Sequence, residues 1–208
     1  RFSDAKKLSV EITQDFPKHQ FAWTVLGAVL KQTGRINESL FAKQKAVELE
    51  PLDALAHCNL GNTLRELGRL DESEASYTQA IALKPDYVLA HYNLGNTLRE
   101  LGRLDEAEAS YTQAIALKPD YAEAYSNLGI TFEELGRLDD AEASYRQSIA
   151  LKSDYYGAHN NLGNTLKELG RLEEAEASYR QAIALKSDFA DAHHNLGVTL
   201  QELARLDE

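Results

Sequence analysis

The chain has 208 residues, of which 43% are hydrophobic and 26% are charged, as is typical of a globular protein with enough apolar side chains for a core. Its 22 Lys and Arg residues stand against 33 Asp and Glu residues, so the net charge is −11. Because an acidic surface repels phosphate backbones and anionic lipids, we expect neither nucleic acid nor a membrane as a partner.

One sequence segment recurs along the chain. NLGNTLRELGRLDE begins at Asn59 and again at Asn93, and NLGNTLKELGRLEE begins at Asn161. The first two copies are 34 residues apart, and a fixed period of this length indicates a solenoid of repeated units.

This period divides the chain into successive repeats. We expect the second half of a truncated repeat at residues 1–19, with Ala5 and Pro17 at matching positions, and the first half of another at residues 190–208. Between them lie full repeats at 20–53, 54–87, 88–121, 122–155 and 156–189.

Each repeat is predicted to form two helices. In the repeat 54–87, apolar residues such as Leu64 recur three or four positions apart, which places them on one helical face. Gly68 predicts a left-handed end to this first helix, and Asp71 is expected to cap the second helix. The second helix is expected to stop before Pro85.

Small residues predict that the two helices approach closely. Gly61 in the first helix and Ser73 in the second leave room for contact, and Tyr77 is expected to pack at the junction. A larger side chain at the equivalent Gly95 should break the pair.

We number positions from the first residue of each repeat. Leu-Gly at positions 7 and 8, Ala at 20, Tyr at 24, Ala at 27 and Pro at 32 resemble the tetratricopeptide repeat (TPR) motif over the whole chain. The resemblance implies an all-α fold, a right-handed superhelical α-solenoid of antiparallel helix pairs. The chain departs from the motif at position 4, which is His57 in the repeat 54–87, and at position 24 of the repeat 20–53, which is Lys43.

The resemblance also implies that the first helix of each repeat lines a concave groove. Asparagines recur there at positions 6 and 9, and a carboxamide can both donate to and accept from a peptide backbone. The predicted peptide-binding residues, with two residues at position 5 added, are Asn59, Asn62, Tyr92, Asn93, Asn96, Asn127, Asn160, Asn161, Asn164 and Asn195. This ladder resembles that of the superhelical arms of the O-linked N-acetylglucosamine transferases. The same asparagines could instead bond to an adjacent helix.

Other groove positions bear on the class of ligand. From the repeat 54–87 onward position 13 is glutamate, which could favour a basic ligand or could be an ordinary solvated residue: Glu66, Glu100, Glu134, Glu168 and Glu202. The lysines that would clamp the terminal carboxylate of a chaperone tail are absent from positions 2 and 5.

We expect no catalytic, metal or cofactor site. The histidines at position 4 lie one repeat apart, too far to share a zinc ion, and are interpreted as packing residues. Cys58 is the only cysteine, and its neighbours give weak grounds for a reactive thiol.

The predicted function is a non-catalytic scaffold that binds a protein or an extended peptide. One alternative is the substrate-recruiting arm of a larger transferase whose catalytic domain lies outside this sequence, and another is self-association through the terminal half-repeats. The chain contains no Met, so the native start is not expected to be present. The sequence has no apolar run of about 20 residues, and its lone cysteine fits a reducing compartment, so we expect a cytoplasmic protein.

Overall fold

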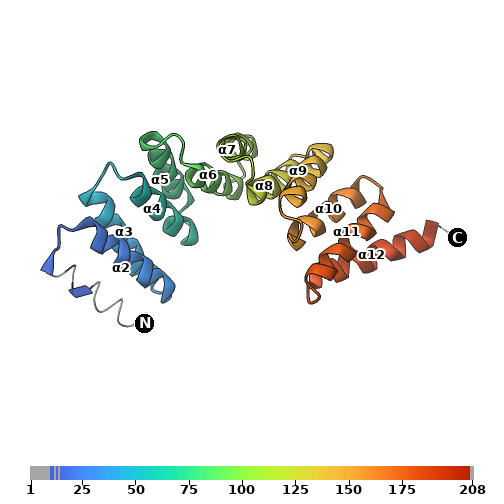
Figure 1. The fold of residues 1–208 in the computed structure, drawn as a ribbon, viewed down its shortest axis with the longest axis horizontal. Helices are drawn as coiled ribbons and strands as arrows, with labels where there is room; N and C mark the ends of the chain where they lie inside the picture. The colour runs from blue at the N-terminus through green and yellow to red at the C-terminus, as the bar shows by residue number, and fades with distance from the viewer. Residues whose placement is uncertain (1–9, 12, 14, 207–208) are drawn as a thin grey trace. The chain divides into compact units, whose positions relative to one another are not determined.

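The computed structural model describes residues 10, 11, 13 and 15–206, and this part of the chain folds into helices without a strand (Figure 1). The predicted half-repeat at 1–19, including Ala5, lies largely outside the described residues. The helices are α2 (Gln20–Gln32), α3 (Ile36–Leu49), α4 (Ala54–Glu66), α5 (Leu70–Leu83), α6 (Val88–Glu100), α7 (Leu104–Leu117), α8 (Ala122–Glu134), α9 (Leu138–Leu151), α10 (Tyr156–Glu168), α11 (Leu172–Leu185) and α12 (Ala190–Leu206).

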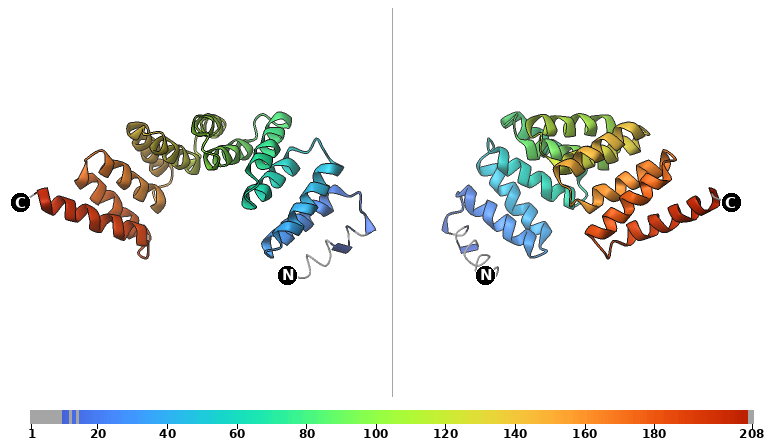
Figure 2. Two further views of the ribbon diagram at one scale, coloured as in Figure 1. Left: turned by 180° about the vertical axis from the view of Figure 1, so that it is seen from behind. Right: turned by 45° about the vertical axis from the view of Figure 1, so that its right-hand side comes forward.

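The chain divides into two compact units, one containing α2–α6 and the other containing α7–α12. Within them, α2 packs on α3, α4 on α5, α8 on α9 and α10 on α11, each pair forming an antiparallel hairpin (Figures 1 and 2). The described residues therefore form the expected all-α fold of antiparallel helix pairs. No described helix is long and apolar enough to cross a membrane.

The first helix of each hairpin ends at a glycine, as predicted. Gly68 has a φ of 71°, in the left-handed region that a residue with a Cβ rarely adopts. The N–H of the next residue, Arg69, then donates to the carbonyl of Leu64 at 2.9 Å, which closes the helix end. Residues 34, 102, 136 and 170 are also glycines with positive φ, so all the described turns of this kind are built in the same way.

The predicted cap at Asp71 is wrong. Helix α5 begins at Leu70, with Arg69 in the N-cap position and no side-chain cap hydrogen bond, so Asp71 already lies within the first turn. The single residue between Gly68 and the helix is Arg69, whose guanidinium has no acceptor for the free N–H groups of the first turn. Arg69 instead donates to both carboxylate oxygens of Glu72, through Nε at 2.7 Å and Nη2 at 2.6 Å. A side-chain cap does occur on α4, where Asp53 accepts from the N–H of Leu55 at 2.9 Å.

The predicted close approach within each hairpin is confirmed. A Cβ at Gly61 would lie 2.8 Å from Cε1 of Tyr77, which is fully buried. The same contact joins Gly129 to Tyr145 and Gly163 to Tyr179. The Ser73 hydroxyl donates to the Gly61 carbonyl at 2.9 Å, so the paired helices are held together by a hydrogen bond as well as by packing.

Hairpins stack on their neighbours within each compact unit. The second helix of one repeat packs on the first helix of the next, as α3 does on α4 and α9 on α10. First helices also contact one another, α4 with α6, α8 with α10 and α10 with α12. The position-4 histidines join this stacking, because Nε2 of His57 lies 2.9 Å from the carbonyl oxygen of Pro51 at the end of the preceding repeat. His91, His159 and His193 make the equivalent contact, so each of these histidines links its helix to the end of the preceding repeat.

Candidate functional site

The predicted asparagine ladder lies on the first helices, and its members bond to one another between repeats. Oδ1 of Asn62 accepts from the Tyr77 hydroxyl at 2.7 Å and from Nδ2 of Asn93 at 3.0 Å. In the other compact unit, Asn164 accepts in the same way from Tyr179 at 2.9 Å and from Asn195 at 3.0 Å. A position-9 carbonyl thus joins the tyrosine of its own repeat to the position-6 amide of the next.

This geometry gives the ladder a structural role. Asn62, Asn93, Asn164 and Asn195 are half-buried, so each is within reach of solvent. The pairing uses the carbonyl of one residue and one amide hydrogen of the other. It leaves the Nδ2 group of Asn62 and the Oδ1 atom of Asn93 without a hydrogen bond inside the described part of the chain.

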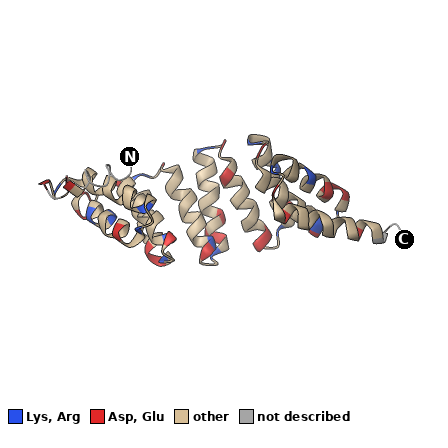
Figure 3. Cartoon of the chain, turned by 90° about the horizontal axis from the view of Figure 1, so that it is seen from below, with Lys and Arg blue, Asp and Glu red and all other residues tan. Residues whose placement is uncertain are grey.

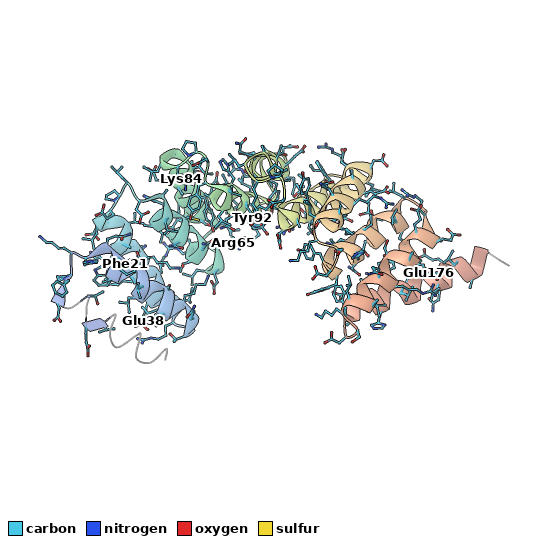
Figure 4. The ribbon with its side chains drawn as sticks, in the orientation of Figure 1. Phe21, Glu38, Arg65, Lys84, Tyr92 and Glu176 are labelled. Carbon is cyan, nitrogen blue, oxygen red and sulfur yellow. The ribbon has the colours of Figure 1, made fainter. Side chains whose placement is uncertain are left out.

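Two of the predicted residues are buried. Asn96 is 7% exposed and Asn160 is 6% exposed. Asn160 accepts from Asn195 at 3.2 Å and lies 3.4 Å from Oδ1 of Asn161, so it supports its neighbours rather than facing open solvent. Tyr92, in α6 (Figure 4), and Asn127 are half-buried.

Asn59 differs from the paired asparagines because its side chain makes no hydrogen bond to the described residues. The preceding repeat has Ala28 at position 9, which has no carbonyl to accept from the Asn59 amide. Asn59 therefore keeps its full hydrogen-bonding capacity while half-buried on α4. At the corresponding place in the other compact unit, Ile130 stands at position 9 and the Tyr145 hydroxyl turns to Glu133 at 2.7 Å instead.

The row of glutamates at position 13 is partly neutralised by cations at position 12 of the preceding repeat. Lys31 pairs with Glu66 at 2.6 Å, and Arg65 (Figure 4) lies 3.8 Å from Glu100. Lys167 and Glu202 form the same pair at 3.2 Å. In Figure 3 the ribbon of each compact unit carries both acidic and basic positions, interspersed with one another. Exposed pairs of this kind contribute only about 0–1 kcal/mol each to stability, but they reduce the negative charge of the row.

Cys58 is a core residue. It is 3% exposed, and burial raises the pKa of its thiol, although hydrogen bonds from Tyr87 and Asn93 act in the opposite direction. A buried thiol with a raised pKa is a poor nucleophile. Across the described residues, no three His, Cys, Asp or Glu side chains are grouped so as to hold a metal ion.

Models of the TPR family match most of the chain. One, described as a TPR repeat, matches residues 61–99, 95–136 and 163–203, and two described as tetratricopeptide repeat match residues 122–155 and 44–75. The chain therefore belongs to the tetratricopeptide repeat family, whose repeats form protein-interaction scaffolds. No curated protein sequence matches it significantly.

Solved structures with the same fold include PilW, described as a widely conserved type IV pilus biogenesis factor. It has a TM-score of 0.85 and 22% identity over 94% of this chain and 90% of its own. YrrB, described as a TPR protein with an unusual peptide-binding site, has a TM-score of 0.72 and 20% identity over 91% of this chain and 98% of its own. A thermophilic TPR protein of Thermus thermophilus has a TM-score of 0.67 and 25% identity over 88% of this chain and 99% of its own.

Proposed function

We propose that this protein is a non-catalytic scaffold that binds an extended peptide along its first helices. The observation that carries the proposal is the regular spacing of carboxamide groups on those helices. After pairing, Asn62 and Asn164 keep amide hydrogens, and Asn93 and Asn195 keep a carbonyl oxygen. Donors and acceptors repeated along a solenoid suit the N–H and C=O groups of a peptide backbone, whatever its side chains.

Two further observations support a peptide ligand. The similar structure of YrrB is described as having a peptide-binding site. Asn62 and Asn164 are already held in place by the buried tyrosines, so little of their side-chain entropy is lost when a ligand binds. Asn96 and Asn160 are the least accessible of the predicted ligand contacts, because both are buried.

Lys31, Arg65 and Lys167 offset part of the glutamate row, so the proposal does not require a basic ligand. The buried, unpaired Cys58 fits action in a reducing compartment such as the cytoplasm.

Self-association is a second candidate, because Phe21 and Phe41 on α2 and α3 are 65% and 54% exposed. Light scattering gives the molar mass of wild type and of a Phe21→Ser/Phe41→Ser variant. Self-association through this surface is supported only if wild type is a dimer and the variant is a monomer.

The test of peptide binding uses peptides selected from a random library on the wild-type protein. We expect Asn93→Ala/Asn127→Ala to bind them roughly 5- to 150-fold more weakly, because each lost hydrogen bond contributes about 0.5–1.5 kcal/mol. Isothermal titration calorimetry gives the affinity, and thermal unfolding checks that the variant is folded.

A matched control is Gln79→Ala, which removes an exposed carboxamide from the second helix α5. We expect it to bind like wild type. Unchanged affinity of the asparagine variant for every selected peptide would remove the ladder from the binding mechanism.

A further inference from the structure

The repeat 20–53 differs from the others at the junction of its two helices. Where Tyr77 packs on Gly61 in the next repeat, Lys43 packs on Gly27, with a Cβ at Gly27 placed 2.9 Å from Cγ of Lys43. A lysine stem is thinner than a tyrosine ring, so it fills less of the space between α2, α3 and α4.

The Lys43 ammonium group is buried with one hydrogen-bond partner. The residue is 6% exposed, and its Nζ atom donates to Oγ1 of Thr63 at 2.5 Å. An ammonium group has three hydrogens to donate, so two have no acceptor among the described residues. Buried charges are normally paired, and an ammonium group held in this way favours an anion as its partner.

A pocket of about 380 Å³ lies at this position, and Lys43 forms part of its wall. Asn59, the ladder asparagine without a partner, forms another part, next to Ala28. Both features have one cause: the repeat 20–53 lacks both the tyrosine and the position-9 asparagine that join neighbouring repeats elsewhere. Lysine in place of the tyrosine and alanine in place of the asparagine thus open the pocket and leave hydrogen-bond donors in it.

The charges around the pocket favour a single negative group. Its lining includes Lys31, Lys43 and Glu66, and Lys31 is already paired with Glu66 at 2.6 Å. The remaining charge is that of Lys43, on a chain whose net charge is −11.

We propose that the pocket between α2 and α4 binds a carboxylate of the ligand, with Lys43 and the Asn59 amide as its hydrogen-bond donors. Two carboxylate oxygens can accept from both groups at once, and hydrogen bonds to charged groups are the stronger ones. The carboxylate comes from an aspartate or glutamate side chain or from a peptide C-terminus. This proposal rests on the proposed peptide-binding function and adds a preferred residue class at one end of the α2–α6 unit.

The test uses three short probes and nuclear magnetic resonance of the Asn59 side-chain amide and the Lys43 Cε group. The probes are acetyl-Gly-Gly-Asp-Gly-Gly-amide, its neutral Asn analogue, and acetyl-pentaglycine with a free C-terminus. We expect saturable shifts with a carboxylate probe and affinity at least about tenfold lower with the Asn analogue. The probe that binds identifies the source of the carboxylate.

Two variants make the test specific. Lys43→Met removes the ammonium group, and Lys43→Tyr restores the residue found in the neighbouring repeats; both should abolish the shifts. Lys45→Met is the matched control, because Lys45 is a more exposed lysine on the same helix and pairs with Glu48. It should bind like wild type.

The proposal is overturned if no carboxylate probe gives saturable shifts, if the Asn analogue binds equally well, or if Lys43→Met binds as wild type does. Such a result would not contradict peptide binding by the asparagine ladder, because these probes are too short to follow the ladder from repeat to repeat. Conversely, the Asn93→Ala/Asn127→Ala variant keeps the pocket, so it can fail to bind long peptides and still bind the carboxylate probe.

Discussion

Single residues decide whether neighbouring repeats are joined or left open. Asn62 accepts from both Tyr77 and Asn93, so one carbonyl connects three helices. With Ala28 and Lys43 at the equivalent positions of the preceding repeat, that connection is absent and Asn59 remains unpaired. Near-identical repeats can therefore present different chemistry at one place in the stack.

Lys43 makes a prediction about pH. Burial, followed by the nearby charge of Lys31, lowers its pKa from 10.5 to about 8. The native state thus releases this proton near pH 8, whereas the unfolded chain keeps it until about pH 10.5. Because the unfolded state binds more protons between these values, Lys43 is destabilising at pH 7 and becomes less so as the pH rises.

We therefore expect Lys43→Met to be more stable than wild type at pH 7. Urea unfolding should show that this advantage shrinks by about 2 kcal/mol between pH 7 and about pH 9.5. An advantage that stays constant with pH would contradict the assigned pKa, and Lys45→Met should show no such trend.

At the scale of helices, the hairpin is held by contact between a glycine and a tyrosine. The Tyr77 ring packs directly on α4, and a Cβ added at Gly61 would lie 2.8 Å from it. The ring is fully buried, so moving it away from an added Cβ would disturb the close-packed core around it. Position 8 therefore sets the distance between the two helices.

We predict that Gly61→Ala lowers the unfolding free energy by about 1–3 kcal/mol, because overpacking forces the helices apart. Gly197→Ala is the matched control, since Gly197 lies in α12 and a Cβ added there would have no atom within 4 Å. That change should be neutral or stabilising by up to about 1 kcal/mol, because alanine favours a helix. Equal destabilisation of both variants in urea unfolding would show that the tyrosine contact does not limit helix spacing.

Sequence periodicity predicted the helices and their glycine ends, because Gly68 and the apolar stripe carry local signals. It misplaced the cap at Asp71, because capping depends on a shift of one or two residues at the helix start. Lys43 was visible as a departure from the repeat, but the pocket was not. Its existence depends on Ala28 in another helix of the same repeat and Asn59 in the next, a juxtaposition that only the packed structure provides.

At the scale of the whole molecule, stacking produces a surface that no hairpin has alone. First helices contact one another within each compact unit, so their carboxamides follow one another from repeat to repeat. The second helices carry a carboxamide too, at position 26, and these exposed residues are Gln79, Gln113, Gln147 and Gln181. The asparagines lie on the first helices and the glutamines on the second helices. A change at one set therefore shows which helices a ligand contacts.

The most direct measurement is therefore the change in side-chain amide resonances when a library-selected peptide is added. We predict that the signals of Asn62, Asn93 and Asn164 shift and saturate together, while those of the position-26 glutamines stay in place. Shifts confined to the glutamines, with the asparagines unmoved, would contradict peptide binding along the first helices.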